Sequence, residues 1–186
     1  MSDLSYGDFG RLFVLYVVTP ERVRDTMWSL AGGELSTSIR LAGGIVRAEG
    51  KGEVTDVSVE RRSDDPLAYR VTLLASLRLV VRVAGVPHRY DGDIRVPLEL
   101  RVTTRDDLSL SIDISSVTAD DLDMELRPAG AAASFVEQIG QVNAQARREV
   151  AQLVNERSNG PAAMAFRRID VGPAIDAEWD RRQDRA

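Results

Sequence analysis

An apolar run near the start of the chain is followed by apolar residues at helical spacing. The run extends from Phe9 to Val18 and is rich in β-forming side chains, so it predicts a strand buried on both faces. Thr19, Pro20 and Glu21 follow, and they suit the N-cap, the first position and the first turn of a helix. Four apolar residues then share one helical face: Val23, Met27, Leu30 and Ala31. Gly32-Gly33 predicts the end of this helix.

Beyond the first helix the hydrophobic period changes to two, the pattern of a sheet with one dry face and one wet face. Leu35 to Leu41 alternates in this way, and Val57 and Val59 continue the alternation towards a polar turn at Ser63 to Pro66. Two glycine pairs interrupt the pattern, at Gly43-Gly44 and within Gly50-Lys51-Gly52. Both predict turns or bulges.

The strongest alternation lies between Tyr69 and Val83, where every second residue is apolar. At about 3.3 Å per residue it predicts a strand of roughly 45 to 50 Å, well beyond the usual five or six residues. After a turn at Gly85 to Pro87, Tyr90 to Val102 predicts a similar return strand. Shorter strands are expected at Leu108 to Ile114 and at Leu122 to Leu126, and together these strands predict an antiparallel meander.

A long amphipathic helix is predicted after Pro128-Ala129-Gly130 and up to about Arg157. Its apolar stripe comprises Ala132, Phe135, Ile139, Val142, Ala146, Val150 and Leu153. Asn159 to Pro161 ends it, and Phe166 to Val171 predicts a short closing strand. We therefore expect a single α+β domain over residues 1–175, followed by a charged and loose C-terminal tail at 176–186.

Composition narrows the classes of function. The 186 residues are 44% hydrophobic and 28% charged, as in ordinary globular proteins. A net charge of -5 without a basic stripe argues against a nucleic-acid partner. The chain contains no cysteine, which excludes disulfides, thiolate catalysis and cysteine-bound zinc. We see no signal peptide in Met1 to Gly10 and no stretch that could span a bilayer, so we expect a cytoplasmic protein without a transmembrane segment.

The balance of predicted elements is unusual, because two helices must cover the apolar face of at least five strands. A flat sheet of that size would leave a large apolar area in water, which small proteins avoid. The sheet must therefore curl strongly around the helices, close on itself, hold an apolar molecule or pair with a second copy.

Two stretches carry a resemblance to a known family. In Leu12 to Val23 a strand runs straight into the first helix, and in Phe135 to Val171 a long helix is followed by Ile169-Asp170-Val171. By this layout, which covers nearly the whole chain without a diagnostic motif, the protein resembles the tubular lipid-binding (TULIP) superfamily. That superfamily includes the bactericidal permeability-increasing protein domains and the synaptotagmin-like mitochondrial lipid-binding domains. The resemblance implies a sheet that wraps the long helix, with acyl chains in the apolar seam.

The helix-grip fold of the START and Bet v 1 type is the alternative. It also lays a long helix across a curled sheet and holds apolar ligands. It usually has two short helices after the first strand and nothing after the last helix. One such helix and a closing strand favour the tubular layout here, although Gly32-Gly33 ends the first helix earlier than is usual in that superfamily.

No set of residues predicts catalysis, a metal or a cofactor. His88 is the single histidine and stands beside a turn, without triad partners nearby. Asp91 to Asp93 and Asp120 to Asp123 lack the spacing of a calcium loop, and Gly50 to Gly52 lacks the ending of a phosphate loop. We therefore expect a protein that is not an enzyme.

The leading hypothesis is the binding or carriage of a lipid or other apolar small molecule between the sheet and the long helix. The predicted walls of this groove are Leu73, Leu77, Val81, Ile94, Leu98, Ile112, Phe135 and Ile139. One alternative is a helix-grip cyclase or hydrolase, for which His88, Tyr69 and Tyr90 are the candidate groups. The other is a homodimer that covers the face of Leu12 to Val18 or joins the strand tips at Gly85 to Arg89.

Overall fold

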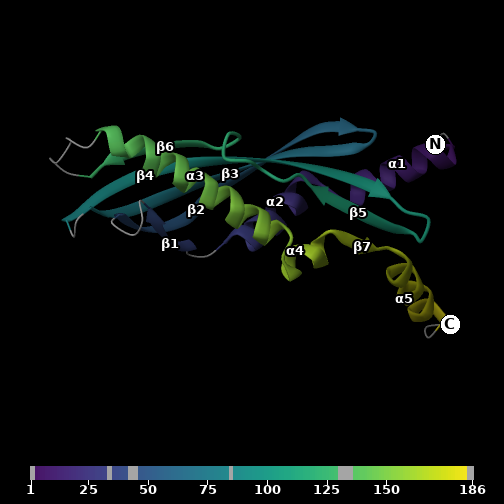
Figure 1. Cartoon of the computed structure of the whole chain (residues 1–186). Coiled ribbons are helices and arrows are strands. Elements are labelled where there is room, and N and C mark those ends of the chain that lie inside the picture. Colours follow the sequence, from purple (N-terminus) through teal and green to yellow (C-terminus); the bar gives the residue numbers. More distant parts are fainter. Residues whose placement is uncertain (1–2, 33–34, 42–45, 84–85, 130–135, 184–186) are drawn as a thin grey trace.

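The computed structural model describes residues 3–32, 35–41, 46–83, 86–129 and 136–183. It is an elongated α+β molecule with a curled antiparallel sheet, along which α3 lies (Figure 1). The helices are α1 (Tyr6–Val17), α2 (Pro20–Ala31), α3 (Val136–Ser158), α4 (Pro161–Phe166) and α5 (Gly172–Gln183). The strands are β1 (Leu35–Leu41), β2 (Val46–Asp64), β3 (Leu67–Val83), β4 (Val86–Thr104), β5 (Ser109–Ile114), β6 (Asp123–Pro128) and β7 (Arg168–Asp170). The predicted fold class, α+β with a curled antiparallel sheet, is confirmed.

Three long strands form the body of the sheet. β2 and β4 have 19 residues each and β3 has 17, and they pair over almost their whole lengths. Burial alternates along β3: Tyr69, Val71 and Leu73 are buried, whereas Arg70 and Arg78 are exposed. The prediction of long strands with one dry face and one wet face is therefore confirmed for β3 and β4.

The expected meander breaks after β4. β5 pairs with Leu100 to Thr104, and β6 pairs with Tyr90 to Arg95 on the same strand. The sheet order is β1-β2-β3-β4-β5-β7, with β6 beside β4 instead of β5. The reason is the length of β5: its six residues pair only with the end of β4, so β6 can satisfy the backbone groups on the same edge of the first half of β4.

The close approach of β6 depends on Gly92. A Cβ at this position would lie 2.5 Å from the carbonyl oxygen of Glu125 and 2.7 Å from a methyl carbon of Leu126. Both distances are too short for any real contact, so β6 can reach this position on β4 because residue 92 has no side chain.

The prediction of a strand at Phe9 to Val18 is wrong, because this segment forms most of α1. Ser5 is the N-cap, and its side-chain oxygen accepts a hydrogen bond from the N–H of Asp8 at 3.1 Å. A run in which nearly every residue is apolar has no clear period, so its pattern cannot separate helix from strand. Burial on both faces is wrong too: none of the residues of α1 is buried, and Tyr6 and Tyr16 are 98% and 73% exposed.

The predicted helix start at Thr19 is confirmed in α2. The Thr19 hydroxyl accepts from the N–H of Arg22 at 3.3 Å, Pro20 occupies the first turn and Gly32 is the C-cap. Arg22 also donates to the carbonyls of Tyr16 and Val17, at 3.2 and 2.9 Å, and so satisfies the end of α1. The α1–α2 junction is thereby fixed.

The prediction of a turn or bulge at Gly50-Lys51-Gly52 is also wrong. These residues continue β2 and pair with Leu79, Arg78 and Leu77 of β3, and the bulges lie further on, between Val54 and Asp56 and between Arg61 and Ser63. Glycine is compatible with both a turn and a strand, so local sequence does not decide between them. Gly43-Gly44 and Gly85 lie outside the described residues, whereas Val86 and Pro87 begin β4.

The end of the chain differs in detail from the prediction. The described part of the long helix is α3, and its expected beginning at Ala132 and Phe135 lies outside the described residues. The strand predicted at Phe166 to Val171 is shortened to β7, because Phe166 ends α4. The tail expected to be loose is helical up to Gln183, in α5. No helix in the described ranges is both long and apolar enough to cross a membrane.

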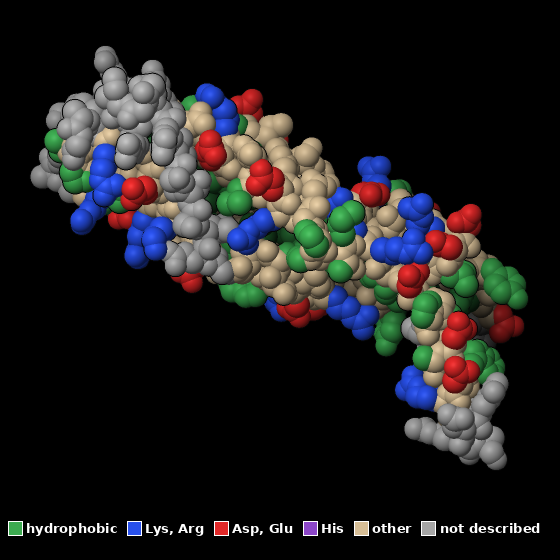
Figure 2. Space-filling view, turned by 60° about the horizontal axis from the view of Figure 1, so that its bottom comes forward, with side chains coloured by type: hydrophobic (Ala, Val, Ile, Leu, Met, Phe, Trp, Pro, Cys, Tyr) green, Lys and Arg blue, Asp and Glu red, His purple; other side chains and the backbone are tan. Residues whose placement is uncertain are grey.

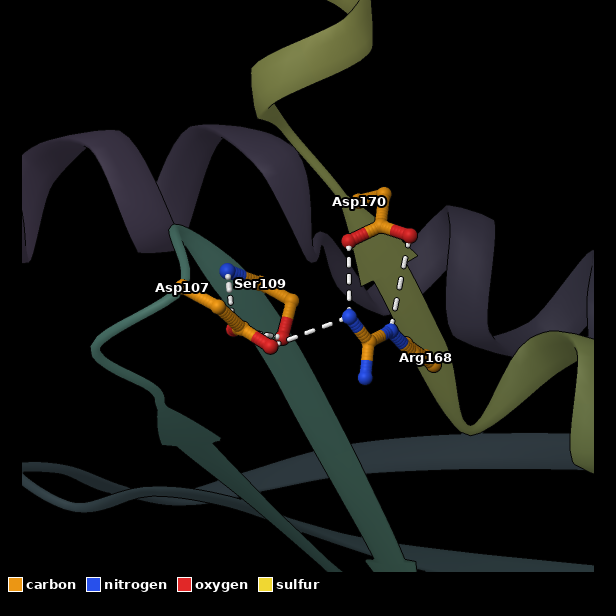
Figure 3. A network of polar contacts seen from close by, with 4 residues as sticks. All are labelled: Asp107, Ser109, Arg168 and Asp170. Atoms are coloured by element: carbon orange, nitrogen blue, oxygen red, sulfur yellow. Dashed lines mark hydrogen bonds and ion pairs between the residues drawn. The ribbon is translucent and has the colours of Figure 1, made fainter.

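A polar network holds β7 on β5 (Figure 3). Arg168 donates to the carboxylate of Asp107 at 3.0 Å and, with two nitrogens, to Asp170 at 3.2 and 3.4 Å. Asp107 also accepts from the N–H of Ser109 at 3.1 Å and from its hydroxyl. The hydrogen bonds from Ser109, with Arg168 nearby, lower the pKa of Asp107 below its usual value. The network joins the β4–β5 turn to the closing strand.

Candidate functional site

A cavity of about 100 Å³ lies between the dry face of the sheet and the two helices that cover it. We call it the seam cavity. Helix α2 contributes Met27, Leu30 and Ala31, and α3 contributes Val150, Leu153, Val154, Arg157 and Ser158. The sheet side is formed by β2, β3 and β4, with Ile114 from β5. The walls are almost entirely apolar, so the site suits a hydrocarbon and not a polar metabolite.

The sheet side of the seam cavity includes two positions of β2 that carry no side chain. Gly50 and Gly52 both line the seam cavity and lie in phase with the buried Ala48 and Val54. In the register of the sheet, Gly52 lies opposite Leu77 of β3, so the neighbouring strand carries a large side chain where β2 has none. Small residues at successive inward positions of a strand indicate close approach of another group. This signal was present in the sequence but was interpreted as a turn.

Four of the eight predicted wall residues line the seam cavity: Leu73, Leu77, Ile94 and Leu98. Val81 and Ile112 are buried elsewhere. Val81 packs in a smaller cluster with Leu79, Tyr90 and Val142, and Ile112 lies in the main core. The alternation predicted correctly that both side chains lie on the buried face of the sheet. Alternation alone, however, does not show which buried residues along a strand border the cavity.

The remaining two predicted wall residues are not among the described side chains. Phe135 lies outside the described residues, and Ile139 lies in α3 while its side chain is outside the described part. Sequence reasoning missed the α2 wall and the second half of α3. The available signal was the spacing of Val150, Leu153 and Val154, which places three apolar residues on one helical face beyond Ala146.

Among the described residues, no acid, histidine or tyrosine lines the seam cavity. Tyr69 is fully buried, its hydroxyl donates to the carbonyl of Val18, and burial raises its pKa. Tyr90 belongs to the smaller cluster, and His88 is half-buried near the start of β4. The seam cavity therefore offers no general acid or base of these types, and the enzyme hypothesis gains no support from it.

The described ranges also contain no candidate metal site. There, no three histidine, aspartate or glutamate side chains gather closely enough to hold an ion. What the seam cavity offers is apolar contact along its walls and one cation, Arg157, at the end of α3.

A second hollow lies at the opposite end of the sheet from β6. This end groove, of about 1040 Å³, is bordered by α1, by the turns β2–β3 and β4–β5, and by Val171 and Ile175 near the start of α5. Phe9, Leu108 and Trp179 are exposed at this end. Figure 2 shows hydrophobic side chains at the surface near α5, among scattered acidic and basic ones.

Comparisons with known proteins give little guidance. No protein-family model and no curated protein matches the chain. Among solved structures, the chain is similar to one titled "Crystal structure of lipopolysaccharide binding protein", with 10% sequence identity and a TM-score of 0.32. The match covers 75% of this chain and 36% of that one, so the chain spans little more than a third of that protein. A likeness of this size carries no argument about ligand or mechanism.

Proposed function

We propose that this protein binds and carries an apolar molecule, a lipid acyl chain or similar hydrocarbon, in the seam cavity. The observation that carries the proposal is a void in the centre of the dry face, lined by apolar side chains and by two inward glycines. Protein interiors are close-packed, and glycine within a strand costs roughly 0.5–1 kcal/mol relative to alanine. A void built at that cost, between two helices and a sheet, favours a function that uses the space.

The seam cavity must widen before it can hold a lipid chain. Small-molecule sites measure roughly 300–1,000 Å³, so a cavity of about 100 Å³ accepts a chain when the seam widens. The α3 side is the part best able to move, because Val150, Leu153 and Val154 are half-buried whereas Leu73 and Leu98 are buried. Ligand binding should therefore displace α3 from β3 and β4.

Native mass spectrometry of the purified protein, with organic extraction of bound material, tests the proposal. We expect co-purified lipid or, after delipidation, uptake of a fluorescent fatty acid. Filling the cavity with Gly52→Leu should reduce uptake several-fold. Gly140→Leu is the matched control, because Gly140 is exposed on α3 and an added Cβ meets nothing within 4 Å. Ligand-free protein that takes up neither fatty acids nor phospholipids would contradict the proposal.

The exposed face of α1 favours a second property, self-association. Phe9, Leu12 and Tyr16 of α1 are 61%, 44% and 73% exposed, and small proteins usually cover apolar surface of this kind. We propose that a second copy covers α1 and the end groove, in keeping with the homodimer expected from the apolar run. A stable interface of this kind should bury at least about 1,000 Å² in total.

A further inference from the structure

The apolar wall of the seam cavity ends at the last turn of α3. There Arg157 and Ser158 line the cavity beside Leu153 and Val154. The third polar residue of the lining, Ser76, alternates with the inward Ala75 and Leu77, which places its side chain towards the opposite face. Among the described residues, Arg157 is thus the one charged group on the lining, and it stands where the cavity meets solvent.

Arg157 differs in its partners from two arginines of the sheet, Arg70 and Arg82. Arg70 pairs with Glu99 at 2.7 Å, and Arg82 pairs with Glu49 at 2.8 Å. Within the described part of the chain, no carboxylate lies within ion-pair distance of Arg157, and its guanidinium has no hydrogen-bond acceptor. The adjacent Glu156 instead accepts from Gln152 at 2.8 Å. The five N–H donors of this guanidinium remain available for a ligand.

A basic residue in the last helical turn also stabilises the helix through a favourable interaction with the helix dipole. That effect requires only a position near the helix end, and it gives no reason for the side chain to border an apolar cavity. The combination of an apolar chamber and an uncommitted guanidinium at its mouth matches an amphiphile with a negative end. Guanidinium binds carboxylate and phosphate groups through two parallel hydrogen bonds.

We propose that the seam cavity selects anionic amphiphiles, with the hydrocarbon between the sheet and α3 and the carboxylate or phosphate on Arg157. Ser158 is placed to give a second donor through its hydroxyl. This inference rests on the proposed function and adds to it the charge of the ligand and the residue that recognises that charge. A neutral amphiphile of the same length would fill the same chamber without the headgroup contact.

Isothermal titration calorimetry of decanoate, decyl phosphate and decanol tests the proposal on the full chain. We expect Arg157→Gln to weaken the binding of the anionic compounds about three- to tenfold, the range for a partly solvated charge-assisted hydrogen bond, and to leave decanol within twofold. Arg157→Lys should recover part of the loss. Arg148→Gln is the control, because Arg148 is exposed on the same helix and does not line the cavity.

The outcomes separate the two proposals. An equal change for decanol and the anionic compounds, or no change with Arg157→Gln, would overturn the headgroup assignment and leave the seam as an apolar site. If none of the three compounds binds the wild-type protein, both proposals fail. The anionic compound with the larger loss identifies whether a fatty-acid carboxylate or a phosphate headgroup is the natural partner.

Discussion

The carboxamide of Asn155 on α3 makes two hydrogen bonds to the backbone of Val117. Its Nδ2 donates to the Val117 carbonyl at 2.8 Å, and its Oδ1 accepts from the Val117 N–H at 2.9 Å. Val117 is buried and lies in the segment between β5 and β6. The Asn155 side chain thus satisfies both of its backbone groups, which a neighbouring strand would otherwise do. It also fastens α3 at the end of the helix that carries Arg157.

Removing this contact should destabilise the protein. Asn155→Ala leaves the N–H and carbonyl of the buried Val117 without partners, and we expect a loss of about 1–3 kcal/mol in the free energy of unfolding. Urea denaturation measures it. Gln152→Ala removes an exposed amide from the same helix and should change stability by less than about 0.5 kcal/mol. Equal effects of the two substitutions would show that Asn155 does not fasten α3.

A methyl group at residue 92 should displace β6. In Gly92→Ala the new Cβ would meet the Glu125 carbonyl oxygen at 2.5 Å, so the strand must shift or detach. We expect a cost of about 1–3 kcal/mol and faster amide exchange in β6 than in β5. Gly140→Ala, where the added Cβ meets nothing within 4 Å, should instead raise stability by up to about 1 kcal/mol through helix propensity. Unchanged exchange in β6 would contradict the steric argument.

Acid should weaken the attachment of β7. The folded pKa of Asp107 is lowered by the hydrogen bonds from Ser109 and by Arg168, so its ionised form stabilises the folded state at pH values above the unfolded pKa. That contribution is lost as the pH falls through the lowered folded pKa, below the ordinary value of 3.8. Arg168 stays protonated throughout this range.

Thermal unfolding between pH 2 and 6 tests the role of Asp107. Asp107→Asn should lower the melting temperature near pH 6, and its difference from the wild type should shrink as the pH falls. Asp106→Asn removes an adjacent exposed carboxylate from the same turn and serves as the control. A difference that stays constant down to pH 2 would rule out a titrating contribution from Asp107.

Self-association through α1 predicts a concentration-dependent mass. By size-exclusion chromatography with light scattering, the wild-type chain should exceed its monomer mass of 20.4 kDa at micromolar concentration. Phe9→Glu places a charge on the exposed face of α1 and should give the monomer. Val86→Glu places a charge at the strand tips instead and should leave the association intact. The reverse result would move the contact to the tips, and a 20.4 kDa wild-type species at all concentrations would exclude the dimer.

The sequence by itself determined the sheet strands with regular alternation and the capped helix. In β3 and β4 each side chain is assigned to one face, because a period of two agrees with a pleated strand and with no helix. Thr19 and Pro20 determined the start of α2 locally, since an N-cap acts through its own backbone neighbours. These features need no knowledge of distant residues.

The tertiary structure decided the features that depend on distant partners. The apolar run at Phe9 to Val18 has no clear period, and in α1 it packs against the core through Val14, Leu15 and Val17. Gly50 and Gly52 suit either a turn or a strand, and pairing with β3 selects the strand. The position of β6 depends on how much of β4 is left unpaired by β5. The seam cavity depends on all of these together, because its walls come from six elements and from no single segment of the chain.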